Sequence, residues 1–182
     1  LAYTFVERLL ELQAHRRRRG EGWTFYHTDV TGLLSHPYVA GCDVELTRRL
    51  EEEIVQERRI AVDGAWLGRN ELLRTIFAPA ADWRALAVWL SAVVAAVARQ
   101  PYEGDDARQR VIAEELERLR NSLDECAIDP TPEIFASLLR RHLQTLRIPY
   151  EGEPLEGVQV MGILETRNLD FENVVILSMT DD

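Results

Sequence analysis

Apolar residues recur every three or four positions through most of the first 150 residues of this chain, which is the spacing of one face of an α-helix. The pattern predicts helices over residues 3–18, 29–36, 43–57, 71–78, 82–99 and 105–125, and a last helix that opens at residues 131–133. Ile60 and Val62 alternate with polar residues and predict a short extended segment before a turn. We therefore expect an all-helical module over residues 1–150.

Several of the predicted helices have recognisable start and stop signals. Thr28, Asn70 and Thr131 each precede a helical run, and their side-chain oxygens can accept a hydrogen bond from a free N–H of the first turn. Gly20 and Gly22 follow the first run and are expected to end that helix. The helix over residues 82–99 is apolar nearly all round and is expected to be buried on most sides.

The pattern changes after residue 148. Two prolines and a glycine in residues 148–154 predict a linker without helical period. Apolar residues within 158–163 and the continuous apolar run over 174–179 predict two strands, the second of them buried on both faces as in an α/β sheet. The predicted fold class is mainly α: a multi-helix insertion module joined to a small α/β piece. Because the chain starts without Met and stops just after the second predicted strand, we expect a fragment of a longer protein.

The two predicted strands carry a sequence that resembles a late motif of the UvrD/RecB-type helicase core, V-Q-x-M-T-x-H-x-x-K-G-L-E-F followed by an apolar strand. Residues 158–161 read V-Q-V-M and residues 169–171 read L-D-F, without a gap between them. This chain departs from the motif's Thr, His, Lys and Gly at four positions: Gly162, Leu164, Arg167 and Asn168.

The L-E-T-R-x-L-D-F form is more similar to the degenerate helicase half of AddB-like proteins, which carry a PD-(D/E)XK nuclease domain. Residues 29–39, D-V-T-G-L-L-S-H-P-Y-V, are similar to a segment of that family's helical insertion. The resemblance implies that residues 151–182 are a fragment of the second RecA-like core domain. It further implies a parent protein that processes double-strand DNA ends for recombinational repair, with ATP and Mg as its cofactors and an AddA-like helicase–nuclease subunit as its partner.

Two groups of residues are candidates for contact with DNA. The resemblance implies a DNA-contact or coupling loop made of Glu165, Thr166, Arg167, Asn168 and Asp170. The other group is the one basic run, whose guanidinium groups suit phosphate; it consists of Arg16, Arg17, Arg18 and Arg19. Each group has a structural alternative: the loop is a solvated turn, and the basic run is the last turn of a helix, where cations oppose the macrodipole.

Charge limits the chemistry further. All 21 basic residues are Arg, and 31 acidic residues give a net charge of −10, which opposes non-specific binding to nucleic acid. A chain without Lys has neither a P-loop nor the D/E-x-K triplet of the nuclease, so we expect no catalytic residue, metal site or cofactor in this chain. The histidines show no ligand spacing and are expected to be structural, and the four tryptophans are expected in the core.

Cys42 and Cys126 have no metal-ligand spacing and are expected to be reduced, buried thiols of a cytoplasmic protein. The longest uncharged run, residues 85–98, is too short to cross a bilayer, so we expect no membrane partner. Two alternatives to the AddB-like assignment remain open. One is a fragment of an active UvrD-type DNA helicase. The other is a helical protein–protein interaction module unrelated to DNA, which the net charge favours.

Overall fold

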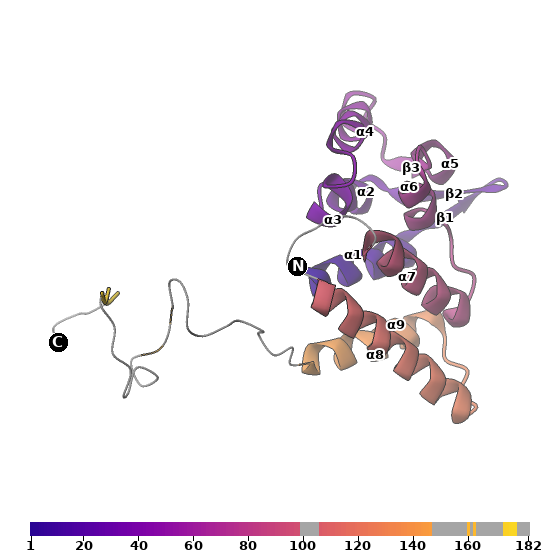
Figure 1. The fold of residues 1–182 in the computed structure, drawn as a ribbon. Coiled ribbons are helices and arrows are strands. Elements are labelled where there is room, and N and C mark those ends of the chain that lie inside the picture. The colour runs from indigo at the N-terminus through magenta and orange to yellow at the C-terminus, as the bar shows by residue number, and fades with distance from the viewer. Residues whose placement is uncertain (99–105, 147–159, 161, 163–172, 178–182) are drawn as a thin grey trace, which may run out of the picture. The chain divides into compact units, whose positions relative to one another are not determined.

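The computed structural model describes residues 1–98, 106–146, 160, 162 and 173–177, and it divides the chain into two units, Leu1–Ile148 and Pro149–Asp182 (Figure 1). The described part of the first unit is mainly helical and contains a small antiparallel sheet. Its elements are α1 (Ala2–His15), β1 (Arg17–Arg19), β2 (Gly22–Tyr26), α2 (His27–Leu34), α3 (Pro37–Ala40), α4 (Val44–Gln56), β3 (Ala61–Asp63), α5 (Gly64–Leu67), α6 (Glu71–Ile76), α7 (Trp83–Ala98), α8 (Asp106–Glu125) and α9 (Pro132–Thr145).

The sheet corrects the prediction of an all-helical module. Its strand order is β1-β2-β3, and both pairs are antiparallel. The first helix ends at His15 rather than at residue 18, because the backbone turns extended at Arg16 and the next three arginines pair with β2. Gly20, with φ of +60°, is the first central residue of a two-residue turn, a position where hairpins favour glycine. The extended segment predicted around Val62 is β3.

Side-chain caps explain where several helices begin. Asn70 Oδ1 accepts from Leu73 N at 2.8 Å at the start of α6, and Thr131 Oγ1 accepts from Ile134 N at 3.4 Å at the start of α9, so both predicted caps are confirmed. The predicted cap at Thr28 is wrong, because α2 already begins at His27 and has no side-chain cap. Thr28 is the second residue of α2 and lies inside its first turn instead.

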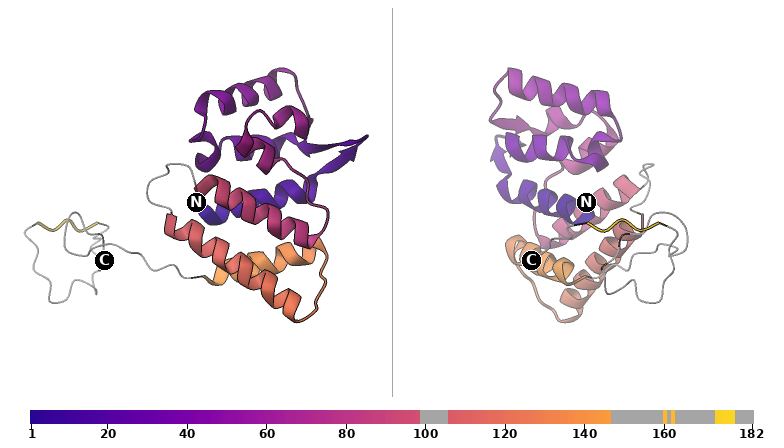
Figure 2. Two further views of the ribbon diagram at one scale, coloured as in Figure 1. Left: turned by 45° about the vertical axis from the view of Figure 1, so that its right-hand side comes forward. Right: turned by 90° about the vertical axis from the view of Figure 1, so that its left-hand side faces the viewer.

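The hydrophobic core of the first unit takes buried side chains from the helices α1 to α9 and from the strands β2 and β3, whose arrangement Figure 2 shows. Phe5 and Leu9 of α1 are fully buried, and Trp83 at the start of α7 packs against Phe135 of α9 with ring centroids 5.6 Å apart. α7 contacts α6, α8 and α9, yet its outer side is uncovered and Val88 is 56 % exposed. The prediction that this helix is buried on most sides therefore holds for the face that carries Leu90, and is wrong for the face of Val88.

His36 is buried against the first turns of α1, between the rings of Phe5 and Tyr38, at centroid distances of 4.9 and 5.1 Å. Its Nδ1 accepts the backbone N–H of Tyr38 at 3.3 Å and so begins α3. Burial disfavours the imidazolium, and the positive charge of Arg8 adds to this, so the pKa of His36 falls from 6.5 to about 4.

We expect this histidine to make the protein less stable in acid. Between pH 6.5 and 4 the unfolded chain binds a proton at His36 that the folded chain does not, so the free energy of unfolding falls as pH falls, by about 3 kcal/mol in all. Urea denaturation of the native protein and His36→Asn at pH 7 and pH 4.5 measures the difference. Asn keeps a cap and removes the titration; an equal loss of stability in both proteins would contradict the account.

In the second unit, residues 173–177 belong to no helix or strand, and Val174, Val175, Ile176 and Leu177 are 58–84 % exposed. In the described part of the predicted strand over residues 174–179, residues 174–177 are therefore neither in a strand nor buried. A strand needs a hydrogen-bonded neighbour, and no strand of the described residues pairs with this segment. For the strand predicted over residues 158–163, the structure describes only Val160 and Gly162, which are also outside any strand.

Candidate nucleic-acid interface

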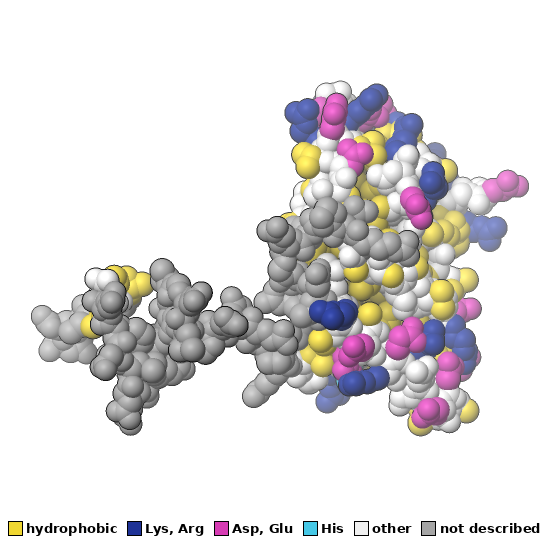
Figure 3. Space-filling model, in the orientation of Figure 1, with side chains coloured by type: hydrophobic (Ala, Val, Ile, Leu, Met, Phe, Trp, Pro, Cys, Tyr) yellow, Lys and Arg dark blue, Asp and Glu magenta, His cyan; other side chains and the backbone are white. Residues whose placement is uncertain are grey.

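The basic run lies on a β-hairpin, formed by β1, a two-residue turn and β2, that projects from the first unit (Figure 1). We call residues 17–26 the arginine hairpin. Arg17, Arg18 and Arg19 are all exposed, and β1 is an edge strand of the sheet, with β2 as its neighbour. The hairpin thus presents three consecutive guanidinium groups to solvent, and the space-filling view shows basic side chains on this projection and an acidic one at its tip (Figure 3).

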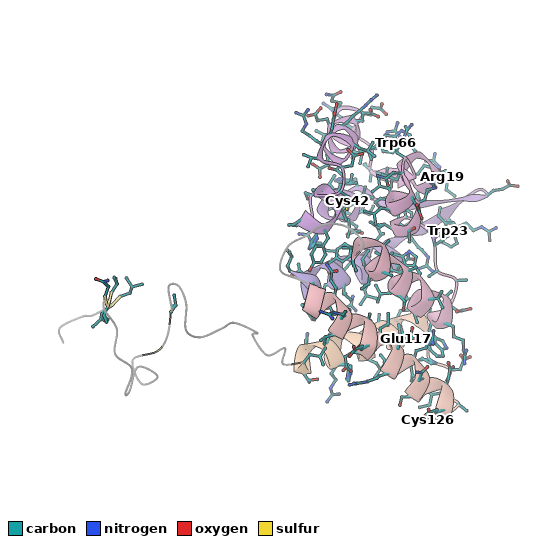
Figure 4. All side chains as sticks on the ribbon, in the orientation of Figure 1. Arg19, Trp23, Cys42, Trp66, Glu117 and Cys126 are labelled. Atoms are coloured by element: carbon teal, nitrogen blue, oxygen red, sulfur yellow. The ribbon has the colours of Figure 1, made fainter. Side chains whose placement is uncertain are left out.

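The register of the hairpin places these arginines on its two faces. Arg17 pairs with Thr24 and Arg19 with Gly22, so these two side chains lie on one face, about 6.7 Å apart along the strand. Arg18 pairs with Trp23, and the two side chains share the opposite face. Figure 4 shows Arg19 and Trp23 on the two strands of the hairpin.

Arg16 has a different position from the three arginines that follow it. Its guanidinium group donates to the carbonyl oxygens of Gln13 and Ala80, and its central carbon lies 5.3 Å from the centre of the Trp23 ring. Burial lowers the pKa of this arginine. The side chain therefore joins the base of the hairpin to the body of the unit and lies over the ring of Trp23, so of the four predicted phosphate contacts Arg16 is already engaged within the protein.

The exposed arginines of the hairpin make no ion pair with an acidic side chain of the described residues, although Glu21 lies in the turn two residues after Arg19. In the described part of the chain, Arg17, Arg18 and Arg19 make no ion pair, whereas at least seven other arginines do. Asp63, on the same sheet, accepts with its Oδ1 from Ala65 N at 2.8 Å and Trp66 N at 3.1 Å at the start of α5, while its Oδ2 lies beside Gly22, the cross-strand partner of Arg19. The hairpin is therefore a local positive site on a protein of net charge −10.

The tryptophans divide into two pairs. Trp83 and Trp89 are buried, which confirms the prediction of a core position for them. Trp23 and Trp66 are only partly buried, and guanidinium groups lie over both rings. Arg59 and Arg69 approach the ring of Trp66 at 4.3 and 5.4 Å. Trp66 still packs against the hydrophobic core, so the prediction of a core position holds for it in part, whereas Trp23 is outside the core cluster and the prediction is wrong for it.

The hairpin was missed from the sequence, although a signal for it exists. The residues after the turn, Gly22 to Tyr26, read G-W-T-F-Y, and three of the five are aromatic while one is β-branched. Such a segment behind a Gly-x-Gly turn is typical of a hairpin strand. The run of arginines before the turn fits a helix end equally well, which is why the pattern of charges alone gave the wrong element.

Other groups of chemically active side chains form local structural pairs. His15 Nδ1 lies 2.8 Å from Asp29 Oδ2, and His142 Nε2 lies 2.6 Å from the mostly buried Glu115, which also accepts from Arg118 at 2.7 Å. Among the described residues, no group of three or more His, Cys, Asp or Glu side chains is arranged to hold a metal ion.

Two further predictions concern the state of the cysteines and the presence of a membrane-spanning helix. Cys42 and Cys126 are free thiols. Cys42 is half-buried and burial raises its pKa, but Cys126 is exposed, so the prediction that both are buried is wrong. No helix in the described ranges is both long and apolar enough to cross a membrane. The loop of Glu165, Thr166, Arg167, Asn168 and Asp170 lies outside the described residues.

No protein-family model, curated protein or solved structure matches this chain.

Proposed function

We propose that this chain is a non-catalytic part of a bacterial AddB-like protein and that its arginine hairpin contacts DNA. In this proposal residues 151–182 belong to the second RecA-like core domain, where neighbouring strands would complete the sheet around residues 174–179. The parent is cytoplasmic, processes double-strand DNA ends for recombinational repair, and works with an AddA-like helicase–nuclease subunit. ATP and magnesium act in other parts of that complex.

One observation supports the DNA contact above all others: three consecutive exposed arginines without an ion pair, on a projecting hairpin. The chain as a whole is acidic, so the electrostatic attraction for a polyanion is strongest at the arginine hairpin. Guanidinium groups donate to phosphate oxygens in a planar fork and stay charged at any physiological pH. The hairpin is closed by a short turn and anchored by Arg16, so the backbone that carries its arginines is already formed before binding.

A second candidate function is a helical protein–protein interaction module. It is favoured by the net charge of −10 and by exposed aliphatic side chains on two helices, Val88 of α7 and Ile134 of α9. The arginines of β1 then have a purely structural role, because charged side chains on an edge strand prevent it from pairing with another chain. The two functions predict different results when these arginines are removed. DNA binding weakens if the hairpin contacts DNA, and DNA binding is not involved if the arginines only protect the edge strand.

The proposal predicts that Arg17→Gln, Arg18→Gln and Arg19→Gln together weaken DNA binding by roughly 100-fold at low salt. Each lost phosphate contact removes counterion release, so the slope of log K against log salt concentration becomes shallower by about 2 to 3. Fluorescence anisotropy with a labelled oligonucleotide over a series of salt concentrations measures both quantities.

The matched control variant carries Arg58→Gln, Arg74→Gln and Arg141→Gln. These three arginines lie elsewhere in the first unit, are also exposed and also make no ion pair with any described residue. The control changes the net charge by the same amount. We expect the control to keep the native slope and to lose less than about threefold in affinity through the general field. Equal losses in the two triple variants, or no DNA binding by the native protein, would refute a contact at the hairpin and favour the protein–protein module.

A further inference from the structure

We infer that the arginine hairpin takes single-stranded rather than duplex DNA, with Trp23 as the side chain on which a base stacks. This inference rests on the proposed function, because it assumes that the hairpin contacts DNA. It adds the class of DNA and a residue that was expected to lie in the core. Three features of the hairpin lead to it.

The first feature is the position of the cations on both faces of a ribbon. Arg17 and Arg19 lie on one face and Arg18 on the other, around the edge strand β1. A duplex is stiff over the length of the hairpin, so it brings phosphates to both faces only if the whole ribbon enters its major groove. A single strand is flexible enough to pass around the edge and bring phosphates to all three arginines.

The second feature is the partly exposed ring of Trp23 beside Arg18. The two residues are a cross-strand pair on one face, so an aromatic ring and a cation are neighbours there. Sites for single-stranded nucleic acid combine cations that follow the backbone with aromatic rings that stack on bases. In a duplex each base is stacked between its neighbours. The ring of Trp23 can therefore stack only on a base of an unpaired strand.

The third feature is that the ring is held in place before any ligand binds. Arg16 lies over Trp23 and is itself fixed by the carbonyl oxygens of Gln13 and Ala80. The backbone of Trp23 also packs closely against α5, since a Cβ added at Gly64 would be only 3.4 Å from the Trp23 oxygen. A ring that is already fixed loses little conformational entropy when a base stacks on it.

The test uses the native protein and three labelled probes of equal length: oligo-dT, the same phosphodiester backbone with abasic sites, and a duplex. We expect oligo-dT to bind about tenfold more tightly than either the abasic strand or the duplex, because one stacked base is worth roughly that factor. Trp23→Leu should lose about tenfold for oligo-dT and change little for the other two probes. Its salt slope should equal that of the native protein, since no phosphate contact is removed.

Two variants separate stacking from a general structural effect. Trp23→Phe keeps an aromatic face and should restore most of the affinity for oligo-dT. Trp66→Leu removes another partly buried tryptophan that lies under guanidinium groups, and should leave the preference for oligo-dT intact. Thermal denaturation identifies any variant that does not fold, and the comparison of the three probes on the native protein tests single-strand recognition without any variant.

The outcomes distinguish this inference from the proposed function. Duplex binding as tight as oligo-dT binding, or equal affinity for abasic strand and oligo-dT, overturns single-strand recognition while the arginine contact stands. An absence of binding to all three probes overturns both. If a poly-glutamate peptide displaces oligo-dT at equal charge concentration, the hairpin recognises negative charge only, and stacking by Trp23 is refuted.

Discussion

Phe25→Ala is expected to lower the free energy of unfolding by about 4 kcal/mol, within the usual range for a buried phenylalanine. Phe25 is 1 % exposed, and its ring lies 5.6 Å from that of Phe77 at the end of α6. It pairs across the sheet with Val62, which is also fully buried. Gly64 lets the ring approach closely, because a Cβ there would lie 3.0 Å from Phe25 Cε2. Truncation leaves a cavity that the backbone of α5 cannot fill.

Urea denaturation of the variant measures this loss, and Tyr26→Ala is the matched control. Tyr26 is the next residue of β2, points to the other face and is 46 % exposed, so its removal should cost less than about 1 kcal/mol. The difference between the two variants reports how firmly the hairpin is anchored in the core. Similar losses at both positions would mean that β2 does not have the orientation described here.

Gln13→Leu is expected to cost about 4 kcal/mol, although leucine has nearly the same volume. Gln13 is 2 % exposed, its Nε2 donates to Ala78 O at 2.8 Å, and its Oε1 accepts from Ala80 N at 3.1 Å. Both groups belong to the segment between α6 and α7, so one side chain of α1 satisfies the carbonyl of half-buried Ala78 and the N–H of buried Ala80. Leucine leaves both without a partner, and each such group costs roughly 1–3 kcal/mol.

The same change on the surface provides the comparison. Gln144 is exposed and donates to the Tyr3 hydroxyl at 3.0 Å, so Gln144→Leu should stay within about 1 kcal/mol of the native protein. Urea denaturation at neutral pH measures both variants. A loss below about 1 kcal/mol for Gln13→Leu would show that water replaces the lost partners and that the segment is not closed to solvent.

The elements that the sequence predicted well are those whose signals are local. α4, α6 and α9 each begin after a side chain that caps the first turn, and each has an apolar face at helical spacing. These signals lie within a few residues of the helix they define, so they act before any tertiary contact forms. α8 followed from its apolar stripe in the same way.

The hairpin and the C-terminal segment depend on contacts that are distant in sequence. Arg16 leaves the helix because its guanidinium group reaches Ala80, 64 residues away, and no local pattern reports that contact. The apolar run at residues 174–177 has the composition of a strand but lacks a paired neighbour among the described residues, so composition alone did not produce a strand. Pairing, unlike capping, depends on residues far along the chain or on another chain.

The candidate site could be predicted only in part. The four consecutive arginines were visible as the one basic run, but which of them faces solvent is set by the register of β1 against β2. Trp23 was predicted to lie in the core. In the structure Asp63 is bound to the N-terminus of α5, while Arg16 and Arg18 are the charged residues placed beside the ring.

The central claim, that Arg17, Arg18 and Arg19 are where this protein meets DNA, has one direct test. Because every basic residue of the chain is an arginine, a nitrogen-15 spectrum of the guanidinium Nε–H groups surveys the whole cationic surface at once. On titration with oligo-dT, we predict that the resonances of these three arginines shift most, while Arg48, Arg49 and Arg141 stay unchanged. Shifts that are spread evenly over all arginines, or that leave the hairpin unaffected, would contradict the account.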